Sequence, residues 1–474
     1  MKIVKITAIL FLLAHYSCND FLNVQPEGEI VNNELFQHAE GFEDALYGVY
    51  AQLAGSSFYG RTMTYYLNDI LAQYYCRGGL TDTTLKICSY QYQDQMVRPT
   101  INRIWSGMYK NIGYVNNILN NLEKYNPGDF AYYRVYQAEC LGLRAFMHFE
   151  LLRLFTENFV NNPSAQGIPY NENYSYEVPA FLSAANTYDK IIEELKKAES
   201  LLVENGEYFH SGDVNLNGFL KDRHIHMNLH AIQSTLARVY WTKGEMKNAA
   251  DYALKVIGSG VFQLASNLEI ENLMNGIISQ KETIWGLYSN NMYASVEKDL
   301  FQYDRGLLLK QEHESNYMVD KEGVDYRYES WFKYYSSSAL TNGLRCIKIF
   351  DTYRLEYRQR EAVPGLSIIR LPELYYIVAE YYLTLNDQVN AMKYLDEVVK
   401  SRGLTPFSER QGVTLTIDHL IRERKKELIC EGQYFHTLKR YHLDVYESQS
   451  GQSYKASNAI YVFPIPDDEV NYRN

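Results

Sequence analysis

The feature that most constrains the fold is a pair of similar segments, Leu236–Ile257 and Val378–Val399, which align without a gap. They read LARVYWTKGEMKNAADYALKVI and VAEYYLTLNDQVNAMKYLDEVV. The aligned positions keep related chemistry and pair Ala237 with Ala379, Tyr240 with Tyr382, Gly244 with Asn386, Ala249 with Ala391, Ala253 with Leu395, and Val256 with Val398. A shared phase over this length indicates an internal repeat.

Each copy has the pattern of two helices joined by a tight turn. Apolar residues recur at helical spacing, and small residues let two helices cross closely. Gly244 and Asn386 stand at the turn, and both residue types accept the left-handed backbone that ends a helix. This is the layout of a degenerate tetratricopeptide repeat, which stacks into a scaffold and carries variation in long insertions. Generic helical hairpins are the alternative interpretation.

Other long segments also have helical periodicity, so the sequence predicts a mostly α-helical fold. The segments, by residue range, are 42–53, 101–122, 133–155, 187–202, 226–244, 246–257, 371–385, 390–403 and 420–438. The segment CIKIF at 346–350 is predicted to be a strand. Two regions are irregular and are predicted to be insertions in the scaffold, 56–100 and 260–365. Both are rich in tyrosine, of which the chain has 44.

The N-terminus has the pattern of an export signal. Lys2 and Lys5 precede a short apolar run that ends before Cys18, and this run is too short to span a bilayer. The stretch resembles a bacterial lipoprotein signal, in which the cysteine is acylated, although His15 occupies a position that is usually aliphatic. We expect a signal peptide at 1–17, a tether at 18–33 that begins with the lipidated Cys18, and a single domain at 34–474.

Charge and cysteine content narrow the remaining classes of function. The formal net charge of −11 repels a phosphate backbone, so nucleic acid is not an expected partner. The six cysteines include no C-x-x-C pair, which removes the common redox and zinc motifs. Cys76 and Cys88 flank a Gly- and Thr-rich segment and could close a small disulfide loop. The sequence leaves that question open.

Several motifs, in order along the chain, resemble the SusD/RagB-like outer-membrane nutrient-binding lipoproteins. They are SCNDFLNVQP, the spacing of Trp105, Tyr109, Ile112 and Asn116, and then AECLGLRAFMHFELLRLF, IIRLPELYYIVAEYY, IRERKKELICEGQYFHTLKR and YVFPIPDDEVNYRN. Gln137 and Thr156 replace glycines that are usual in the family, and Gln433 stands where arginine is common. The match runs nearly from end to end.

The resemblance implies about four degenerate tetratricopeptide helix pairs, with the irregular insertions on one face. It implies a lipid anchor in the outer membrane and a SusC-like TonB-dependent transporter as partner. The expected function is non-catalytic capture of an oligosaccharide at the cell surface, with no cofactor. Two alternatives stay open: a peptide-binding or purely structural lid of such a transporter, and a soluble periplasmic repeat adaptor.

Glycan binding needs aromatic faces and amide or guanidinium donors, and the two insertions supply both. By region and chemistry, the candidate ligand contacts are Tyr74, Tyr75, Tyr90, Tyr92 and Arg98 in the first insertion, and Tyr288, Asn290, Asn291, Tyr293 and Trp331 in the second. For each of them, packing within a loop is the alternative role.

Enzymatic and metal sites are weaker hypotheses. Glu423, Glu427 and Glu431 recur at helical spacing and are predicted to form ion pairs rather than a catalytic pair. The motifs G-x-S-x-G, H-E-x-x-H and the phosphate-binding loop are absent from the sequence. His224, His226 and His230 form the clearest candidate for a metal-binding cluster, but no acidic residue shares their helical phase.

Overall fold

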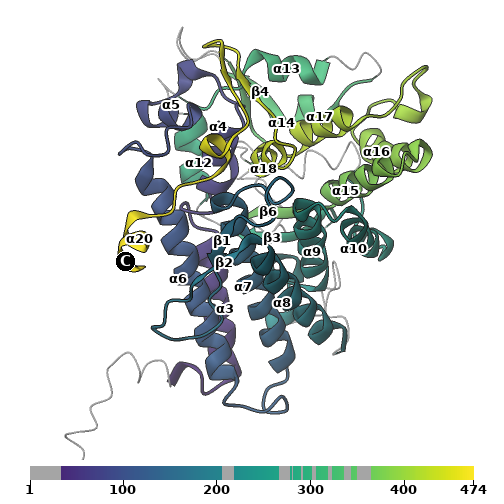
Figure 1. Cartoon of the computed structure of the whole chain (residues 1–474). Coiled ribbons are helices and arrows are strands. Elements are labelled where there is room, and N and C mark those ends of the chain that lie inside the picture. The colour runs from purple at the N-terminus through teal and green to yellow at the C-terminus, as the bar shows by residue number, and fades with distance from the viewer. Residues whose placement is uncertain are drawn as a thin grey trace, which may run out of the picture. The chain divides into compact units, whose positions relative to one another are not determined.

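The computed structural model describes residues 34–204, 218–265, 278–279, 281–289, 292–301, 306–318, 323–335, 343–349 and 365–473. The predicted signal peptide and tether, including Cys18, lie outside these residues. The chain divides into the units Met1–Asp44 and Ala45–Asn474. The packing described below is that of the second unit (Figure 1).

Helices dominate the described residues. Their bounds are α3 (Ala39–Leu53), α4 (Leu67–Leu71), α5 (Asp82–Cys88), α6 (Arg98–Leu122), α7 (Tyr133–Phe155), α8 (Ala184–Glu204), α9 (Leu229–Lys243), α10 (Met246–Gly258), α12 (Met292–Phe301), α13 (Gln311–Met318), α14 (Tyr326–Trp331), α15 (Leu371–Thr384), α16 (Gln388–Ser401), α17 (Ile417–Glu427), α18 (Gln433–Arg440), α19 (Asn458–Tyr461) and α20 (Asp467–Arg473). The mostly helical class predicted from the sequence is therefore confirmed. Among the described residues, no helix is long and apolar enough to cross a membrane.

The described strands are short and form two-stranded antiparallel sheets. Their bounds and pairs are β1 (Gln166–Pro169) with β2 (Phe181–Ser183), β3 (Thr283–Tyr288) with β6 (Gly365–Arg370), β4 (Phe332–Tyr335) with β5 (Gly343–Cys346), and β7 (Val445–Glu447) with β8 (Gln452–Tyr454). The strand predicted at 346–350 is misplaced, because β5 ends at Cys346. Its register is set by pairing with β4, in which Cys346 lies opposite Phe332.

Successive helices pack against one another as the repeat predicts. In series, α6 contacts α7, α7 contacts α8, α8 contacts α9, α9 contacts α10, α10 contacts α15, and α15 contacts α16 (Figure 1). The two copies of the repeat are the hairpins α9–α10 and α15–α16. Small residues at their crossings, including Ala237 and Ala379, are fully buried.

The turns of the two hairpins have the same backbone conformation. Gly244 has φ 88° and Asn386 has φ 56°, both in the left-handed region. In the first copy the backbone N–H of Glu245 donates to the carbonyl of Tyr240 at 2.9 Å, and in the second Asp387 donates to Tyr382 at 2.9 Å. These bonds satisfy carbonyls that would otherwise be orphaned at the helix end. The predicted helix ends are thus confirmed in both copies.

The repeat also extends to a pair of stacked tyrosine rings. Tyr240 stacks on Tyr252 with ring centroids 5.8 Å apart, and Tyr382 stacks on Tyr394 with centroids 5.6 Å apart. The interplanar angles are 16° and 9°. Each stack joins the first helix of its hairpin to the second. Aromatic contacts of this kind stabilise beyond their buried area.

A buried cluster of ion pairs surrounds the C-terminal end of α17. Glu427 accepts hydrogen bonds from Arg370 and Arg402 at 2.8 Å each and from Arg327 at 3.0 Å. Burial alone would raise the pKa of Glu427, but the adjacent guanidinium groups outweigh burial and hold its pKa well below the usual value. The predicted ion-pair role of Glu427 is confirmed.

The cluster continues from Glu427 and is balanced in charge. Its carboxylates are those of Asp325, Glu282, Glu423, Glu427 and Glu431, and its cations are those of Arg327, Lys348, Arg370, Arg402 and Lys426. Buried charges are tolerated when each has a partner. Because Glu282, Asp325, Arg327 and Lys348 belong to the 260–365 insertion, the cluster fixes that insertion to the last helices of the scaffold.

Candidate functional site

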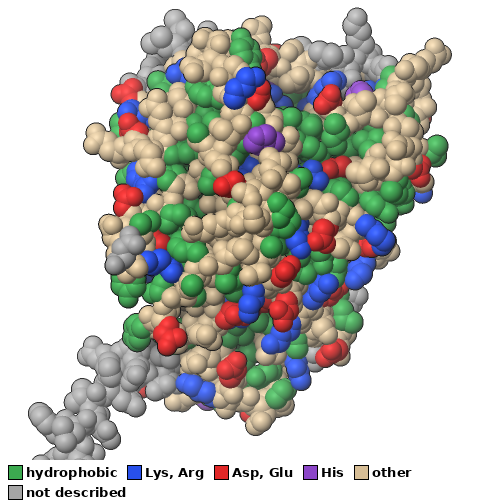
Figure 2. Space-filling model, in the orientation of Figure 1, with side chains coloured by type: hydrophobic (Ala, Val, Ile, Leu, Met, Phe, Trp, Pro, Cys, Tyr) green, Lys and Arg blue, Asp and Glu red, His purple; other side chains and the backbone are tan. Residues whose placement is uncertain are grey.

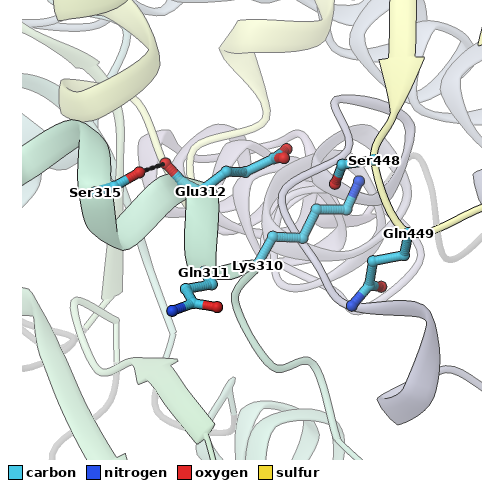
Figure 3. A pocket seen from close by; sticks show the side chains of 6 residues that line it. All are labelled: Lys310, Gln311, Glu312, Ser315, Ser448 and Gln449. Atoms are coloured by element: carbon cyan, nitrogen blue, oxygen red, sulfur yellow. Dashed lines mark hydrogen bonds between the residues drawn. The ribbon is translucent and has the colours of Figure 1, made fainter. Parts of the chain in front are cut away.

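A polar pocket of about 460 Å³ lies where the second insertion meets the C-terminal hairpin. Figure 3 shows its lining, which consists of Lys310, Gln311, Glu312, Ser315, Ser448 and Gln449. The first four residues come from the start of α13 and the residue before it. The last two lie at the tip of the β7–β8 hairpin. We refer to it as the first pocket.

Backbone pairing brings the two predicted insertions together beside this pocket. Tyr75 and Leu309 form an antiparallel bridge. The N–H of Cys76 donates to the carbonyl of Leu308 at 2.7 Å, and the N–H of Lys310 donates to that of Tyr74 at 3.1 Å. The first insertion therefore positions the pocket through its backbone, and α13 begins directly after this contact.

Gly79 permits the close approach of the two insertions. Its carbonyl accepts a hydrogen bond from the N–H of Gly306 at 3.2 Å. A Cβ atom at Gly79 would lie 2.1 Å from the carbonyl oxygen of Gly306, a distance that no side chain could keep. The close packing of the two insertions therefore requires glycine at position 79.

Lys310 and Glu447 form a buried ion pair in the wall of the pocket. The Lys310 Nζ lies 3.0 Å from the Glu447 Oε1, and both side chains are almost fully buried. Burial alone would raise the pKa of Glu447, but hydrogen bonds from Ser450 and Lys310 outweigh it and lower the pKa to about 2. The pair neutralises itself, so its lysine offers no free charge to a ligand.

The hairpin tip is held by hydrogen bonds on both sides. Glu447 Oε1 accepts from the N–H of Gln449 at 3.1 Å, and its Oε2 accepts from the N–H of Ser450 at 2.8 Å. The Gln449 Oε1 accepts from the N–H of Arg77 at 2.6 Å, which ties the tip to the first insertion. The pocket wall is consequently preorganised by three segments that are distant in sequence.

Three polar side chains of the first pocket have no hydrogen-bond partner among the described residues. In the described part of the chain, the side chains of Gln311, Glu312 and Ser448 make no hydrogen bond or ion pair. The charged ends of Lys310 and Glu312 both point toward Ser448 (Figure 3). An amide, a carboxylate and a hydroxyl together provide donors and acceptors for ligand hydroxyl groups.

Two family sequence models match most of the chain. Residues 20–241 match a SusD-like family described as starch-binding and associating with the outer membrane, and residues 311–474 match the SusD family. The first match ends before the second insertion begins, and the second match begins inside that insertion, at the start of α13.

The chain belongs to the SusD/RagB family. The predicted resemblance is therefore confirmed. The chain is 24% identical over 333 residues to SusD-like protein P2 of Formosa agariphila, an alignment that covers 68% of this chain and 57% of that relative. The chain thus aligns with little more than half of the relative's length.

Solved structures of SusD superfamily members share the fold. A member from Bacteroides thetaiotaomicron has a TM-score of 0.72 at 23% identity, with 91% of this chain and 97% of that chain covered. Surface glycan-binding protein A from Bacteroides uniformis has a TM-score of 0.68 at 17% identity, with 92% and 98% covered. At these identities the likeness shows the fold alone.

Within this SusD-family fold, most of the aromatic residues predicted to contact ligand are packed inside the protein. Tyr74, Tyr75, Tyr90 and Tyr92 are all less than 8% exposed. Their hydroxyls donate to the backbone carbonyls of Lys425, Tyr65, Leu71 and Ile460 at 2.6 to 2.8 Å. Rings packed in this way have no face open to a ligand, and their role in the structure is to anchor the first insertion.

Arg98 and Trp331 are likewise engaged by the protein. The Arg98 Nη2 donates to the carboxylate of Asp467 at 2.5 Å and to the carbonyl of Ile465 at 2.8 Å. Trp331 is fully buried, and the Nζ of Lys348 lies 4.2 Å from its ring centroid. Arg98 therefore holds the C-terminal segment, while Trp331 packs beside the buried ion cluster.

Of the remaining predicted contacts, Tyr288 alone has a described side chain, and it is 47% exposed at the end of β3. Tyr293 belongs to α12. Asn290 and Asn291 lie outside the described residues. Ligand contact by Tyr288, Asn290, Asn291 and Tyr293 stays a prediction.

Sequence reasoning missed the hairpin residues Ser448 and Gln449. The stretch VYESQSGQSY from 445 to 454 has two short runs separated by a Ser-Gly turn, a pattern that indicates a β-hairpin. That signal predicts the hairpin but not its neighbour. The contact with Arg77, 372 positions earlier in the chain, depends on tertiary structure.

The two cysteines that could have closed a loop are free thiols. The Cys88 Sγ donates to the Oε1 of Gln73 at 3.3 Å, and the Cys76 Sγ donates to the carbonyl of Leu309 at 3.1 Å. Burial raises the pKa of both thiols, which disfavours the reactive thiolate. Hydrogen bonding rather than a disulfide therefore holds the first insertion at this point.

Two of the three histidines of the candidate metal-binding cluster, His226 and His230, have separate partners. The His226 Nδ1 lies 3.2 Å from Glu139, which also accepts from Tyr50 at 2.6 Å and Arg223 at 2.5 Å. The His230 Nδ1 lies 3.2 Å from the Oε1 of Gln233. Within the described ranges, no group of three or more His, Cys, Asp or Glu side chains could hold a metal ion.

Proposed function

We propose that this protein is a lipid-anchored, non-catalytic binding subunit at the cell surface, which captures an oligosaccharide and delivers it to a TonB-dependent transporter. Family membership supports the class of protein, and a relative of the same fold carries the name of a surface glycan-binding protein. The observation that carries the proposal is the first pocket, where the side chains of Gln311, Glu312 and Ser448 make no hydrogen bond to the described residues.

The chemistry of the first pocket suits a neutral hydroxylated ligand. Sugar hydroxyls both donate and accept, and the pocket offers an amide, a hydroxyl and a carboxylate. The Lys310 charge is neutralised by Glu447, so an anionic ligand would meet Glu312 without a free cation beside it. On the face drawn in Figure 2, acidic and basic side chains are interspersed rather than gathered by sign.

The carboxylates near the first pocket favour binding over hydrolysis. A glycosidase needs two carboxyl groups placed across the ligand, one of them protonated to act as a general acid. Glu447 is buried against Lys310 with a pKa of about 2, so it stays ionised and turned away from a ligand. Glu312 would then lack the second carboxyl group that hydrolysis requires.

The location in this proposal rests on the sequence around Cys18. The basic residues Lys2 and Lys5, the short apolar run and the polar stretch after Cys18 fit a lipoprotein signal and a tether. A single acyl chain binds a membrane weakly, whereas multiple chains anchor it stably. Replacing Cys18 with alanine is expected to move the protein from the membrane fraction to the soluble fraction, and unchanged fractionation would contradict lipid anchoring.

The test of ligand class is a calorimetric titration with soluble neutral hexasaccharides: maltohexaose, laminarihexaose, xylohexaose and mannohexaose. We expect at least one of them to bind. The first-pocket variant, Gln311→Ala with Ser448→Ala, is expected to weaken that binding about tenfold, corresponding to about 1.4 kcal/mol. The matched control is Gln52→Ala, an exposed glutamine on α3 that does not line the first pocket.

The outcomes separate the proposal from its main alternative. Binding that falls in the double variant but not in Gln52→Ala, with unchanged thermal unfolding, supports oligosaccharide capture. If none of the four glycans binds while a peptide library yields a ligand, the peptide-binding alternative replaces it.

A further inference from the structure

A second polar pocket lies at the base of the β7–β8 hairpin, at the end opposite its tip. Its volume is also about 460 Å³, and its lining is Glu157, Asn158, Asn161, Asn162, His442, Ser457, Asn458 and Tyr461. The first four residues come from the loop after α7. His442 precedes the β7–β8 hairpin, and the remaining three lie after it, at Ser457 and in α19. The volume is within the range of small-ligand sites. We refer to it as the second pocket.

Hydrogen bonds fix the loop that forms one wall of the second pocket. The Asn158 Nδ2 donates to the carbonyls of Lys439 and Arg440 at 2.9 Å each, and its Oδ1 accepts from the N–H of Val160 at 3.2 Å. The Asn162 Nδ2 donates to Glu157 at 3.2 Å. This loop is therefore bound to the end of α18.

The opposite wall is fixed as firmly. The Tyr461 hydroxyl donates to the carbonyl of Leu443 at 2.5 Å, and the N–H of Phe463 donates to the carbonyl of Leu154 at 3.0 Å. His442 has φ 51°, in the left-handed region that few residues other than glycine adopt. Strained backbone of this kind persists where surrounding contacts hold it. Both walls are thus shaped before a ligand arrives.

The free polar groups of the second pocket are neutral. In the described ranges, the side chains of Asn161, Ser457 and Asn458 make no hydrogen bond. Each amide offers two donors and a carbonyl acceptor, and serine offers one donor with acceptor capacity. No lysine or arginine belongs to the lining, and its one carboxylate, Glu157, is held by Asn162.

This lining excludes some ligand classes and favours one. An anion would find no basic side chain other than the imidazole of His442, and it would lie near Glu157. An apolar ligand would bury amide groups without partners, at a cost of about 1–3 kcal/mol for each group. A neutral polyhydroxylated ligand instead satisfies Asn161, Ser457 and Asn458.

We propose that the second pocket binds a neutral saccharide unit, as a subsite separate from the first pocket. The class of ligand in this inference rests on the proposed function. The location of the subsite rests on the residues that line the second pocket. The hairpin joins the two pockets, because Gln449 is at its tip while His442 and Ser457 flank its base. A strand rises about 3.3 Å per residue, so the three-residue strands β7 and β8 separate the tip from the base by roughly 10 Å.

The test is a titration of the full chain with the four neutral hexasaccharides and with hexagalacturonate as an anionic probe. The second-pocket variant is Asn161→Ala with Asn458→Ala. The matched control is Asn120→Ala with Asn186→Ala, two exposed helical asparagines outside both linings. We expect the second-pocket variant to weaken binding of a neutral hexasaccharide at least fivefold, with thermal unfolding and the control unchanged.

Three results would overturn the inference, and they are distinguishable. Wild-type affinity in the second-pocket variant, for glycans whose binding the first-pocket variant weakens, rejects the second subsite and leaves the proposed function standing. Loss of hexagalacturonate binding alone rejects the neutral class. If no hexasaccharide binds the wild-type chain, the proposed function fails and the inference fails with it.

Discussion

The buried ion cluster around Glu427 and the first pocket use similar residues in opposite ways. In the cluster, every carboxylate of the set has a cationic partner, as Glu427 has in Arg327, Arg370 and Arg402. In the first pocket, Glu312 has no ion pair among the described residues. Both regions draw on the same insertion. The difference shows that one part of an insertion fixes it to the scaffold while another part keeps polar groups free.

The largest expected effect on stability comes from replacing Glu427 in the buried ion cluster. Replacing it with alanine leaves Arg370 and Arg402 buried with fewer partners. Removing one member of a buried ion pair costs about 3–5 kcal/mol in the free energy of unfolding. Chemical denaturation measures the loss, and Glu397→Ala on the exposed side of α16 is the control. A loss below about 1 kcal/mol for Glu427→Ala would contradict the structural role of the cluster.

The pH dependence of stability tests a second buried charge, Glu139. Burial alone would raise the pKa of Glu139, but Arg223 and His226 outweigh it and lower the pKa from 4.5 to about 2. Because the folded-state pKa lies below the unfolded value, this contribution is present above about pH 4.5 and is lost as the pH falls toward 2. The loss corresponds to about 3 kcal/mol.

Denaturation of the wild type and Glu139→Gln across this pH range measures the effect. The variant is expected to lose less stability than the wild type between pH 4.5 and 2, since the group that takes up the proton is gone. Parallel pH profiles for the two proteins would show that Glu139 has an ordinary pKa in the folded state.

In the first pocket, a change of charge is expected to alter binding and leave stability almost untouched. Glu312→Gln keeps the shape of the side chain and removes its charge. Exposed substitutions usually change the free energy of unfolding by less than about 0.5 kcal/mol. Calorimetry with the tightest-binding hexasaccharide is expected to show a several-fold loss of affinity. A marked loss of stability with unchanged affinity would assign Glu312 to the scaffold.

The smallest expected effects are at the turns of the scaffold repeat. Gly244→Ala places a Cβ in left-handed backbone and 3.0 Å from the Cγ2 of Val160, so a loss of about 1 kcal/mol is expected. Asn386→Gly relieves the left-handed cost and is expected to be neutral or slightly stabilising. Thermal unfolding of the two variants measures the difference. Equal losses of stability in the two variants would contradict the expectation that the left-handed backbone decides which residue each turn prefers.

The sequence predicts the scaffold well because its signals are local. The aligned positions of the repeat and the left-handed turn at Asn386 depend on neighbours within one hairpin, so spacing reveals them. The helix predicted at 133–155 matches α7, which ends at Phe155 and is followed by an extended Thr156. Periodicity and turn chemistry are sufficient for such elements.

The candidate site was harder to predict because tyrosine serves two purposes. Tyr74 and Tyr92 lie in an irregular, aromatic segment, which is what a ligand loop requires, yet their hydroxyls are used by backbone carbonyls distant in sequence. The same composition fits a loop packed inward. Gln449 was missed for a related reason, since its neighbour Arg77 is brought to it by tertiary contacts alone.

The measurement that tests the central claim most directly is a crystal structure of the protein with the hexasaccharide that binds it most tightly. The account predicts sugar hydroxyls within hydrogen-bonding distance of Gln311, Glu312 and Ser448, at the junction of the second insertion and the β7–β8 hairpin. A hexasaccharide bound with the first pocket empty would contradict the account.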